Sequence, residues 1–111
     1  MEKFTRTTPR YPFAAPAELF CDGKVGTGAT VREISLYGCY LDFSEPYPPG
    51  ARVSLKISFE NSFFEAEATV IYAKPNLGMA VVFQDVKPEF IAVLVKWMSA
   101  AMEKNRNGLA L

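Results

Sequence analysis

Residues 52–59 read Arg-Val-Ser-Leu-Lys-Ile-Ser-Phe, and they indicate the architecture of the chain more plainly than any other stretch. The apolar residues alternate strictly with polar ones, which is the pattern of a β-strand that buries one face. A second run, residues 64–72, alternates in the same way around Glu65, Glu67 and Thr69. Shorter or weaker runs with this period occupy residues 15–21, 25–34, 39–43 and 79–83. The chain is therefore expected to form six short strands.

Turn residues separate these runs. Asp22-Gly23 suits a two-residue hairpin turn that needs positive φ. Further breaks lie at residues 48–50, 60–62 and 75–78, which are rich in proline, glycine and asparagine. Because no helix separates the strands, they are expected to pair antiparallel. Six strands with one apolar face close most economically into a barrel, which leaves no exposed edge. The predicted fold class is all-β, mainly antiparallel: a six-stranded β-barrel with one C-terminal α-helix.

The helix follows from a change of period near the C-terminus. Large apolar residues recur there at spacings of three and four, at Phe90, Ile91, Leu94, Trp97, Met98, Ala101 and Met102. Pro88 suits a first helical turn, Lys104 suits a last turn, and Gly108 suits a stop. We expect one amphipathic helix over residues 88–105 that covers the open end or side of the barrel. The alternative is that Trp97 and the methionines form a surface for a partner.

Composition limits the classes of function. The 111 residues fit one domain, and half of them are apolar, which suffices for a hydrophobic core. Twelve basic residues balance twelve acidic ones, so neither DNA nor RNA is an expected partner. No apolar run approaches the roughly 20 residues that cross a bilayer, and the N-terminus lacks an apolar signal core. The protein is predicted to be soluble and cytoplasmic, without membrane insertion. Two cysteines without a CxxC pattern predict buried, reduced thiols.

Residues 1–13 are polar, basic and interrupted by prolines, so they are predicted to form an extended arm ahead of a barrel domain at residues 14–111. The arm carries Arg6 and Arg10, four residues apart. One interpretation is a solvated tail. The other uses the planar guanidinium, which can donate two parallel hydrogen bonds to a phosphate or a guanine edge and can stack on a base.

A second motif, Glu33-x-Ser35-x-x-Gly38, lies where one strand is expected to end and the next to begin. As a turn, it would have Ser35 as its cap and Gly38 at positive φ. As a site, it offers a carboxylate for the adjacent N1–H and N2–H₂ donors of guanine and a hydroxyl for a phosphate or purine nitrogen. Strand alternation would direct Glu33 and Ser35 outward and Ile34 into the core.

With both motifs in order, the chain resembles the PilZ domain family of small β-barrels that bind cyclic di-GMP. The family signature is RxxxR followed by [D/N]xSxxG. Arg6 and Arg10 match its first part, and Ser35 and Gly38 match its second, with Glu33 at the acidic or amide position. The resemblance covers nearly the whole chain and includes Pro49-Gly50, the strand at residues 78–83 and the C-terminal helix.

The resemblance implies a stand-alone receptor for cyclic di-GMP. Arg6 and Arg10 would bind its phosphates and stack on or hydrogen-bond its guanines. Glu33 and Ser35 would read a guanine and the adjoining backbone, and Gly38 would leave room. The arm would swing over the barrel and signal to a protein effector of motility, polysaccharide or regulatory machinery. No enzymatic activity, metal or cofactor is expected.

Three alternatives stay open at this stage. Glu33 is one methylene longer than the usual Asp, which suggests a degenerate adaptor that binds a protein and no nucleotide. Its partner surface would use the aromatic residues Phe4, Tyr11, Phe13 and Tyr37. An enzyme would have to work without histidine, from Ser35, a cysteine or the Glu65 and Glu67 pair. An oligonucleotide-binding barrel fits the fold but conflicts with zero net charge.

Overall fold

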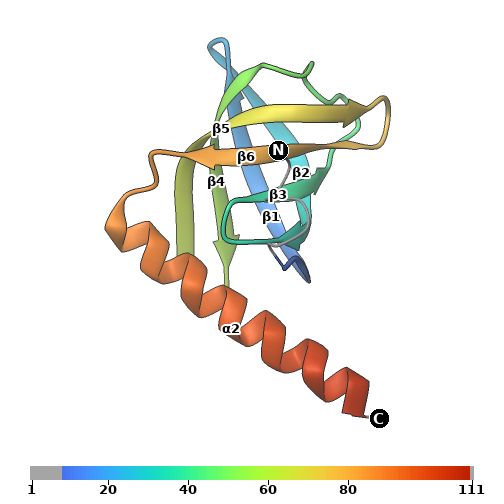
Figure 1. Cartoon of the computed structure of the whole chain (residues 1–111). Helices are drawn as coiled ribbons and strands as arrows, with labels where there is room; N and C mark the ends of the chain where they lie inside the picture. The colour runs from blue at the N-terminus through green and yellow to red at the C-terminus, as the bar shows by residue number, and fades with distance from the viewer. Residues whose placement is uncertain (1–8, 111) are drawn as a thin grey trace, which may run out of the picture.

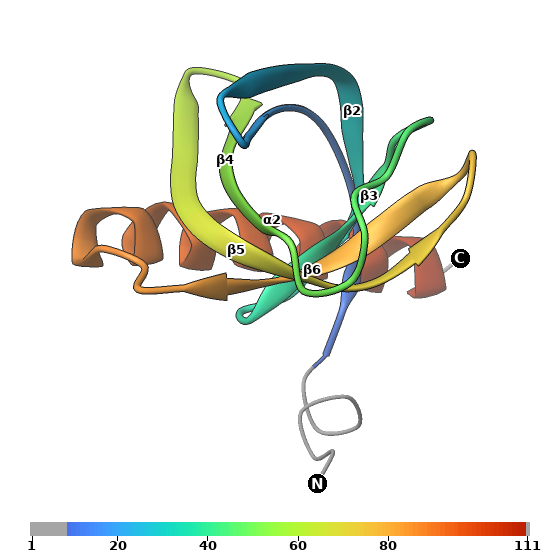
Figure 2. The ribbon, with the colours of Figure 1, turned by 90° about the horizontal axis from the view of Figure 1, so that it is seen from above.

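The strands form a closed antiparallel barrel, and its ring of strands is seen from above in Figure 2. The computed structural model describes residues 9–110 and the side chains of residues 9–104. The elements are β1 (Tyr11–Cys21), β2 (Lys24–Ile34), β3 (Gly38–Asp42), β4 (Arg52–Phe59), β5 (Ser62–Lys74), β6 (Gly78–Gln84) and α2 (Pro88–Ala110). Around the barrel the strand order is β1-β2-β3-β6-β5-β4, and β4 pairs with β1 to complete the ring. The expected fold class is confirmed.

The inward residues of the alternating runs fill the barrel. In β4, the side chains of Val53, Leu55 and Ile57 are buried, whereas the residues between them are at least partly exposed. Burying one such side chain is worth about 1.5–3 kcal/mol. The turn between β1 and β2 also follows the sequence, because Asp22 (φ 52°) and Gly23 (φ 77°) have the two positive φ angles of a type I′ hairpin.

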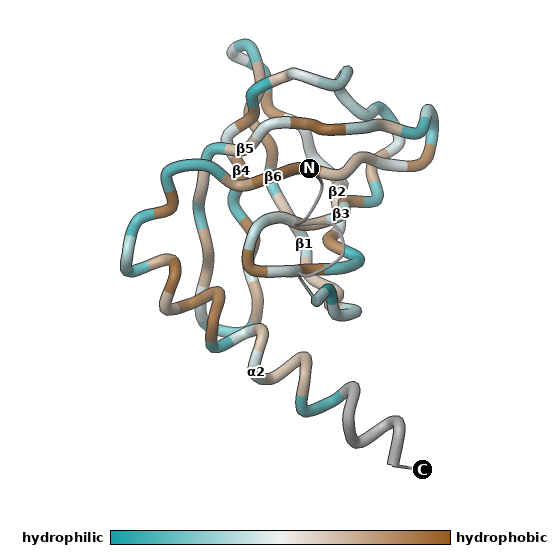
Figure 3. Tube along the Cα trace, in the orientation of Figure 1, coloured by the Kyte–Doolittle hydropathy of each residue, from teal (hydrophilic) through white to brown (hydrophobic). Residues whose placement is uncertain are grey.

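Helix α2 crosses one end of the barrel and continues past it (Figure 1). Its more hydrophobic segments lie in the first turns, near the barrel (Figure 3). Trp97 is buried and its ring packs against Phe13, Phe59 and Phe64 at centroid distances of 5.4, 5.9 and 6.4 Å. The indole Nε1–H donates a hydrogen bond to Ser62 Oγ at 3.3 Å. Trp97 is therefore part of the core that joins the helix to β1, β4 and β5.

The apolar stripe of α2 is wider than the surface that the barrel covers. Leu94, Trp97 and Ala101 are buried, but Ile91 and Met102 are 45% and 43% exposed. The expectation that the whole stripe is covered is therefore wrong for these two residues. Along the described chain, α2 included, no helix is both long and apolar enough to cross a bilayer.

Two boundaries differ from the expectation. Strand β1 begins at Tyr11 rather than near Ala14, because Phe13 extends the buried alternation of the strand by one step. Helix α2 runs to Ala110 rather than to residue 105, so Gly108 does not end it. A glycine inside a helix costs only about 1 kcal/mol relative to alanine, which does not force a stop.

Candidate functional site

Arg10 lies directly before β1 and is exposed. It lines a small hollow on the outer surface of the barrel together with Ser35 and Gly38, which lie some 25 residues later in the chain. Within residues 9–104, its guanidinium has no hydrogen-bond or ion-pair partner. Arg6, the other arginine of the motif, lies outside the described residues. The fold thus brings three of the five candidate residues to one place.

Ser35 holds the turn between β2 and β3. Its hydroxyl accepts hydrogen bonds from the backbone N–H groups of Tyr37 (3.1 Å) and Gly38 (3.2 Å) and donates one to the Gly38 carbonyl (3.3 Å). The expected cap is confirmed. Ser35 does not face outward as expected, however, because it is buried. A hydroxyl offers one donor and two acceptor positions, so this turn uses all three.

Gly38 does not have the positive φ that was expected of it as a turn residue. Positive φ among the described glycines occurs at Gly23, Gly28 and Gly50, so the prediction of positive φ at Gly38 is wrong. Instead, a Cβ atom at Gly38 would collide with the backbone carbonyl oxygen of Val81 on β6. The glycine therefore allows β3 and β6 to approach closely beneath the hollow.

Glu33 faces outward because β2 contains a β-bulge. The register with β3 shifts between Val31 and Glu33, so Val31 and Ile34 both point inward and are fully buried. Arg32 and Glu33, which lie between these two residues in the sequence, therefore both point to the outer face. Arg32 Nε donates to Asp42 at 3.0 Å, and this hydrogen bond is the first cause of the raised pKa of Arg32. In the part of the chain that the structure describes, the Glu33 carboxylate has no such partner.

Glu33 does not line the hollow that Arg10, Ser35 and Gly38 line. Its backbone lies opposite Tyr40, and Tyr40 does line the hollow. The volume of this hollow is about 80 Å³. Ligand pockets usually measure about 300–1,000 Å³, so a dinucleotide would have to lie on the surface and be covered by something else. A larger hollow of about 720 Å³ between α2 and strands β1 and β2 contains none of the described motif residues.

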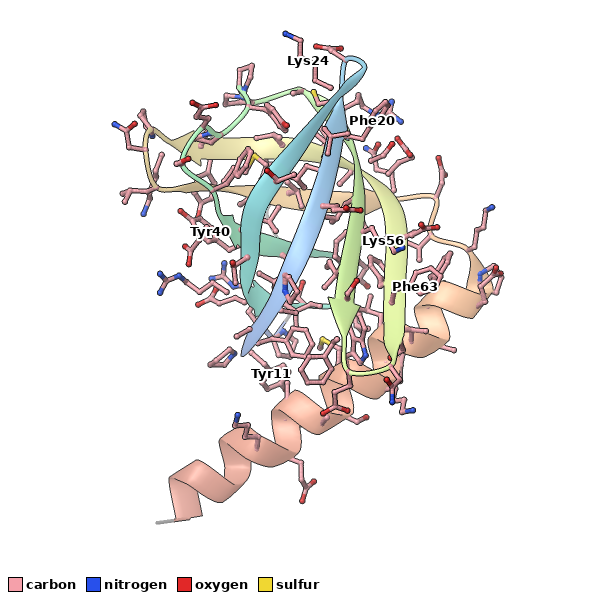
Figure 4. All side chains as sticks on the ribbon, turned by 180° about the vertical axis from the view of Figure 1, so that it is seen from behind. Tyr11, Phe20, Lys24, Tyr40, Lys56 and Phe63 are labelled. Atoms are coloured by element: carbon pink, nitrogen blue, oxygen red, sulfur yellow. The ribbon has the colours of Figure 1, made fainter. Side chains whose placement is uncertain are left out.

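Sequence reasoning missed the residues Tyr40, Ile71 and Tyr72 on this face. Tyr40 and Ile71 line the hollow, and the rings of Tyr40 and Tyr72 lie 6.3 Å apart. Partial burial raises the pKa of the Tyr40 phenol, and Tyr72 and Asp42 raise it further. Alternation could have identified Tyr40, since it points outward between inward Cys39 and Leu41. In Figure 4, Tyr40 lies at the opposite edge of the barrel from Lys56 and Phe63.

The cysteines form no disulfide. Cys39 is buried as expected, and burial raises the pKa of its thiol to about 12. Cys21 is only partly buried, so the expectation of two buried thiols is wrong for it. Over the described residues, no three histidine, cysteine or acidic side chains are arranged to hold a metal ion.

Comparison with known proteins identifies the family and the fold of the chain. The model of the PilZ domain family matches residues 4–100, which is most of the chain. The chain belongs to the PilZ domain family. PilZ domains are regulatory receptor domains and not enzymes. A search of curated proteins finds no match to this PilZ domain.

Solved structures share the fold of this PilZ domain. One is the PilZ domain with c-di-GMP of YcgR from Escherichia coli, with a TM-score of 0.77 and 13% identity over 95% of this chain and 97% of that one. Another is the inhibitor of motility MotI/DgrA from Bacillus subtilis, with a TM-score of 0.70 and 14% identity over 92% of this chain. This chain covers 51% of that protein. At these identities the likeness concerns the fold alone.

Proposed function

We propose that this PilZ domain binds cyclic di-GMP on the outer face around Arg10 and relays binding to a protein partner. The observation that carries the proposal is the meeting of Arg10 with the Ser35–Gly38 turn at one hollow. Arg10 is exposed there, and no described side chain neutralises it. An unpaired guanidinium beside an uncharged turn suits a phosphate or a guanine edge.

The residues of the two motifs would divide the work. Arg10, with Arg6, would bind phosphate and guanine groups through the guanidinium fork. Glu33 would accept hydrogen bonds from a guanine edge, and Gly38 would keep β3 and β6 close beneath the ligand. Ser35 would act on the ligand indirectly by fixing the turn, because its hydroxyl is fully used there. Membership of the PilZ family supports cyclic di-GMP as the ligand, and the PilZ domain of YcgR, which shares this fold, was solved with c-di-GMP.

Relay to a partner would use the N-terminal arm. The hollow is too small to enclose a dinucleotide, so a bound ligand would need a cover, and the arm carries the first motif. Ordering of the arm on the ligand would change the surface that a downstream protein meets. The proposed partner is a protein of the motility, polysaccharide or regulatory machinery. The proposed location is the cytoplasm.

Calorimetric titration of the purified protein with cyclic di-GMP tests the proposal, with GTP as the control ligand. We expect micromolar or tighter binding of cyclic di-GMP only. Arg10→Ala should abolish the heat signal while the circular dichroism spectrum stays unchanged. Arg10→Lys keeps the charge but loses the fork, and it should bind much more weakly than the wild type. Unchanged binding by Arg10→Ala would refute the role of Arg10.

A degenerate adaptor is the second candidate, and one observation favours it. Leu36 and Tyr37, at the tip of the β2–β3 turn, are 45% and 57% exposed and offer an apolar surface for a protein. Of the other aromatic residues predicted for such a surface, Phe13 is buried, Tyr11 is partly buried against the core, and Phe4 lies outside the described residues. The adaptor predicts no nucleotide binding by the wild type. Gain of binding by Glu33→Asp would show that the pocket had decayed through this one residue.

A further inference from the structure

A row of four residues crosses the outer face of the barrel beside the hollow. Glu33 lies opposite Tyr40, Tyr40 lies opposite Ala80, and Ala80 lies opposite Tyr72, on strands β2, β3, β6 and β5. Cross-strand neighbours on one face are close enough for their side chains to interact. The row therefore combines a carboxylate with two aromatic rings and places a small residue between the rings.

Two β-bulges produce this row. The bulge in β2 turns Glu33 outward, as described above. In β5 the register with β6 shifts between Val70 and Tyr72, so Ile71 and Tyr72 are both exposed, while Val70 is buried. Without these bulges, strand alternation would bury one residue of the pair Arg32 and Glu33 and one residue of the pair Ile71 and Tyr72. Both irregularities lie in the strands that border β3 and β6, which form the floor of the hollow.

The Tyr40 ring is held in place by its surroundings. It lies against Gly78 on β6, where a Cβ atom would come within 2.9 Å of the Tyr40 Oη and 3.0 Å of its Cε1. On another side it meets the Tyr72 ring at 6.3 Å with an interplanar angle of 44°. A ring held in this way loses little freedom when a flat ligand stacks on it, which favours affinity.

We infer that Tyr40 provides one stacking face for a guanine base of the ligand, with Arg10 on the other face and Glu33 at the base edge. The inference rests on the proposed function, since it concerns the same ligand. Arg10 and Tyr40 line the same narrow hollow, and both a guanidinium plane and a phenol ring stack on bases. The Glu33 carboxylate, next to Tyr40 across the strands, matches the N1–H and N2–H₂ donors of guanine. Tyr72 positions Tyr40 and does not itself contact the base.

Affinity measurements on tyrosine variants test the inference. Aromatic stacking on a base is worth enough to change affinity about 5–150-fold. Tyr40→Leu should therefore weaken cyclic di-GMP binding by about this factor, and Tyr40→Phe should bind like the wild type. The affinity of Tyr72→Leu for cyclic di-GMP should lie between the affinities of these two variants. Phe20→Leu is the matched control, because Phe20 is also an exposed strand aromatic but lines a different hollow; it should bind like the wild type.

Ring-proton NMR shifts separate stacking from a purely structural role. Saturation of the wild type with cyclic di-GMP should shift the Tyr40 ring protons upfield, as assigned from the Tyr40→Phe spectrum, and leave those of Tyr47 unchanged. If the wild type binds but Tyr40→Leu binds equally well, or the Tyr40 ring protons do not move, the inference is wrong and the proposed function stands. If the wild type does not bind at all, both are overturned.

Discussion

The junction between α2 and the barrel differs sharply from the outer face around Arg10. At the junction, Trp97 is 2% exposed, surrounded by rings, and its N–H is satisfied by Ser62. On the outer face, Tyr37 is 57% exposed, and Arg10 and Glu33 have no hydrogen-bond or ion-pair partner among the described residues. The Trp97 side chain is thus buried with its one donor paired, whereas the described part of the outer face keeps hydrogen-bonding groups that no described residue uses.

This contrast separates stability from function. The junction uses apolar burial, which is non-directional and does not depend on a ligand. The outer face keeps exposed rings and the charges of Arg10 and Glu33, which no described residue pairs; these groups contribute little to the core and are available to a ligand. Substitutions at the junction should therefore lower the free energy of unfolding, whereas substitutions on the outer face should lower the affinity for the ligand.

The largest effect is expected at the junction. Trp97→Ala should lower the free energy of unfolding by about 3–5 kcal/mol, because it removes a buried indole and leaves a cavity among Phe13, Phe59 and Phe64. Chemical denaturation measures this loss. Arg10→Ala is the matched change in the other region, and it should alter stability by less than about 0.5 kcal/mol. Equal losses in both variants would remove the distinction.

Gly38→Ala should cause the next largest loss of stability. The new methyl group would meet the Val81 carbonyl on β6, so the strands must separate, at a cost of about 1–3 kcal/mol. Gly28→Ala serves as a comparison, because Gly28 has positive φ but open space around its Cβ position. Thermal denaturation of the two variants tests whether close strand approach, rather than backbone φ, explains Gly38. A Gly38→Ala variant as stable as the wild type would contradict it.

Ser35→Ala should cost about 1–2 kcal/mol, because the N–H groups of Tyr37 and Gly38 lose their acceptor. The same variant should bind cyclic di-GMP more weakly through a looser turn. Amide hydrogen exchange at Tyr37 and Gly38 should become faster, while exchange near Trp97 stays unchanged. Weaker binding with no change in exchange would instead indicate direct contact between Ser35 and the ligand.

The last prediction concerns Cys39, whose ionisation affects stability only at alkaline pH and has no effect at neutral pH. Burial raises the pKa of Cys39 from 9.0 to about 12, so between these pH values the unfolded chain releases a proton that the folded chain retains. The free energy of unfolding should therefore fall as pH rises through this range. Cys39→Ala should remove that part of the alkaline destabilisation, and Cys21→Ala should retain it. Identical pH profiles for Cys39→Ala and the wild type would show that Cys39 contributes nothing.

Most of the fold could be predicted because period two and turn residues act locally. All six strands, the Asp22-Gly23 turn and the helix follow from spacings that the sequence displays. The bulges at Arg32 and Ile71 were missed because each is a register shift between two strands. A hint exists in Val31-Arg-Glu-Ile34, where two polar residues separate inward apolar ones.

The candidate site was harder to predict from the sequence. The motifs indicated which residues matter, but the environments of Ser35 and Gly38 depend on hydrogen bonds within the turn and on the approach of β6. Neither is visible in a single strand. Tyr40 and Tyr72 were missed because their proximity depends on β6 lying between β3 and β5, an order that the chain does not display.

Backbone amide NMR shifts on addition of cyclic di-GMP show where the ligand binds. We expect saturable shifts at Arg10, at residues 33–40 and at Ile71 and Ala80, with the Trp97 indole N–H and the Ser62 amide unmoved. Shifts concentrated at the helix junction or in the larger hollow beside α2, with none around Arg10, would contradict binding on the outer face.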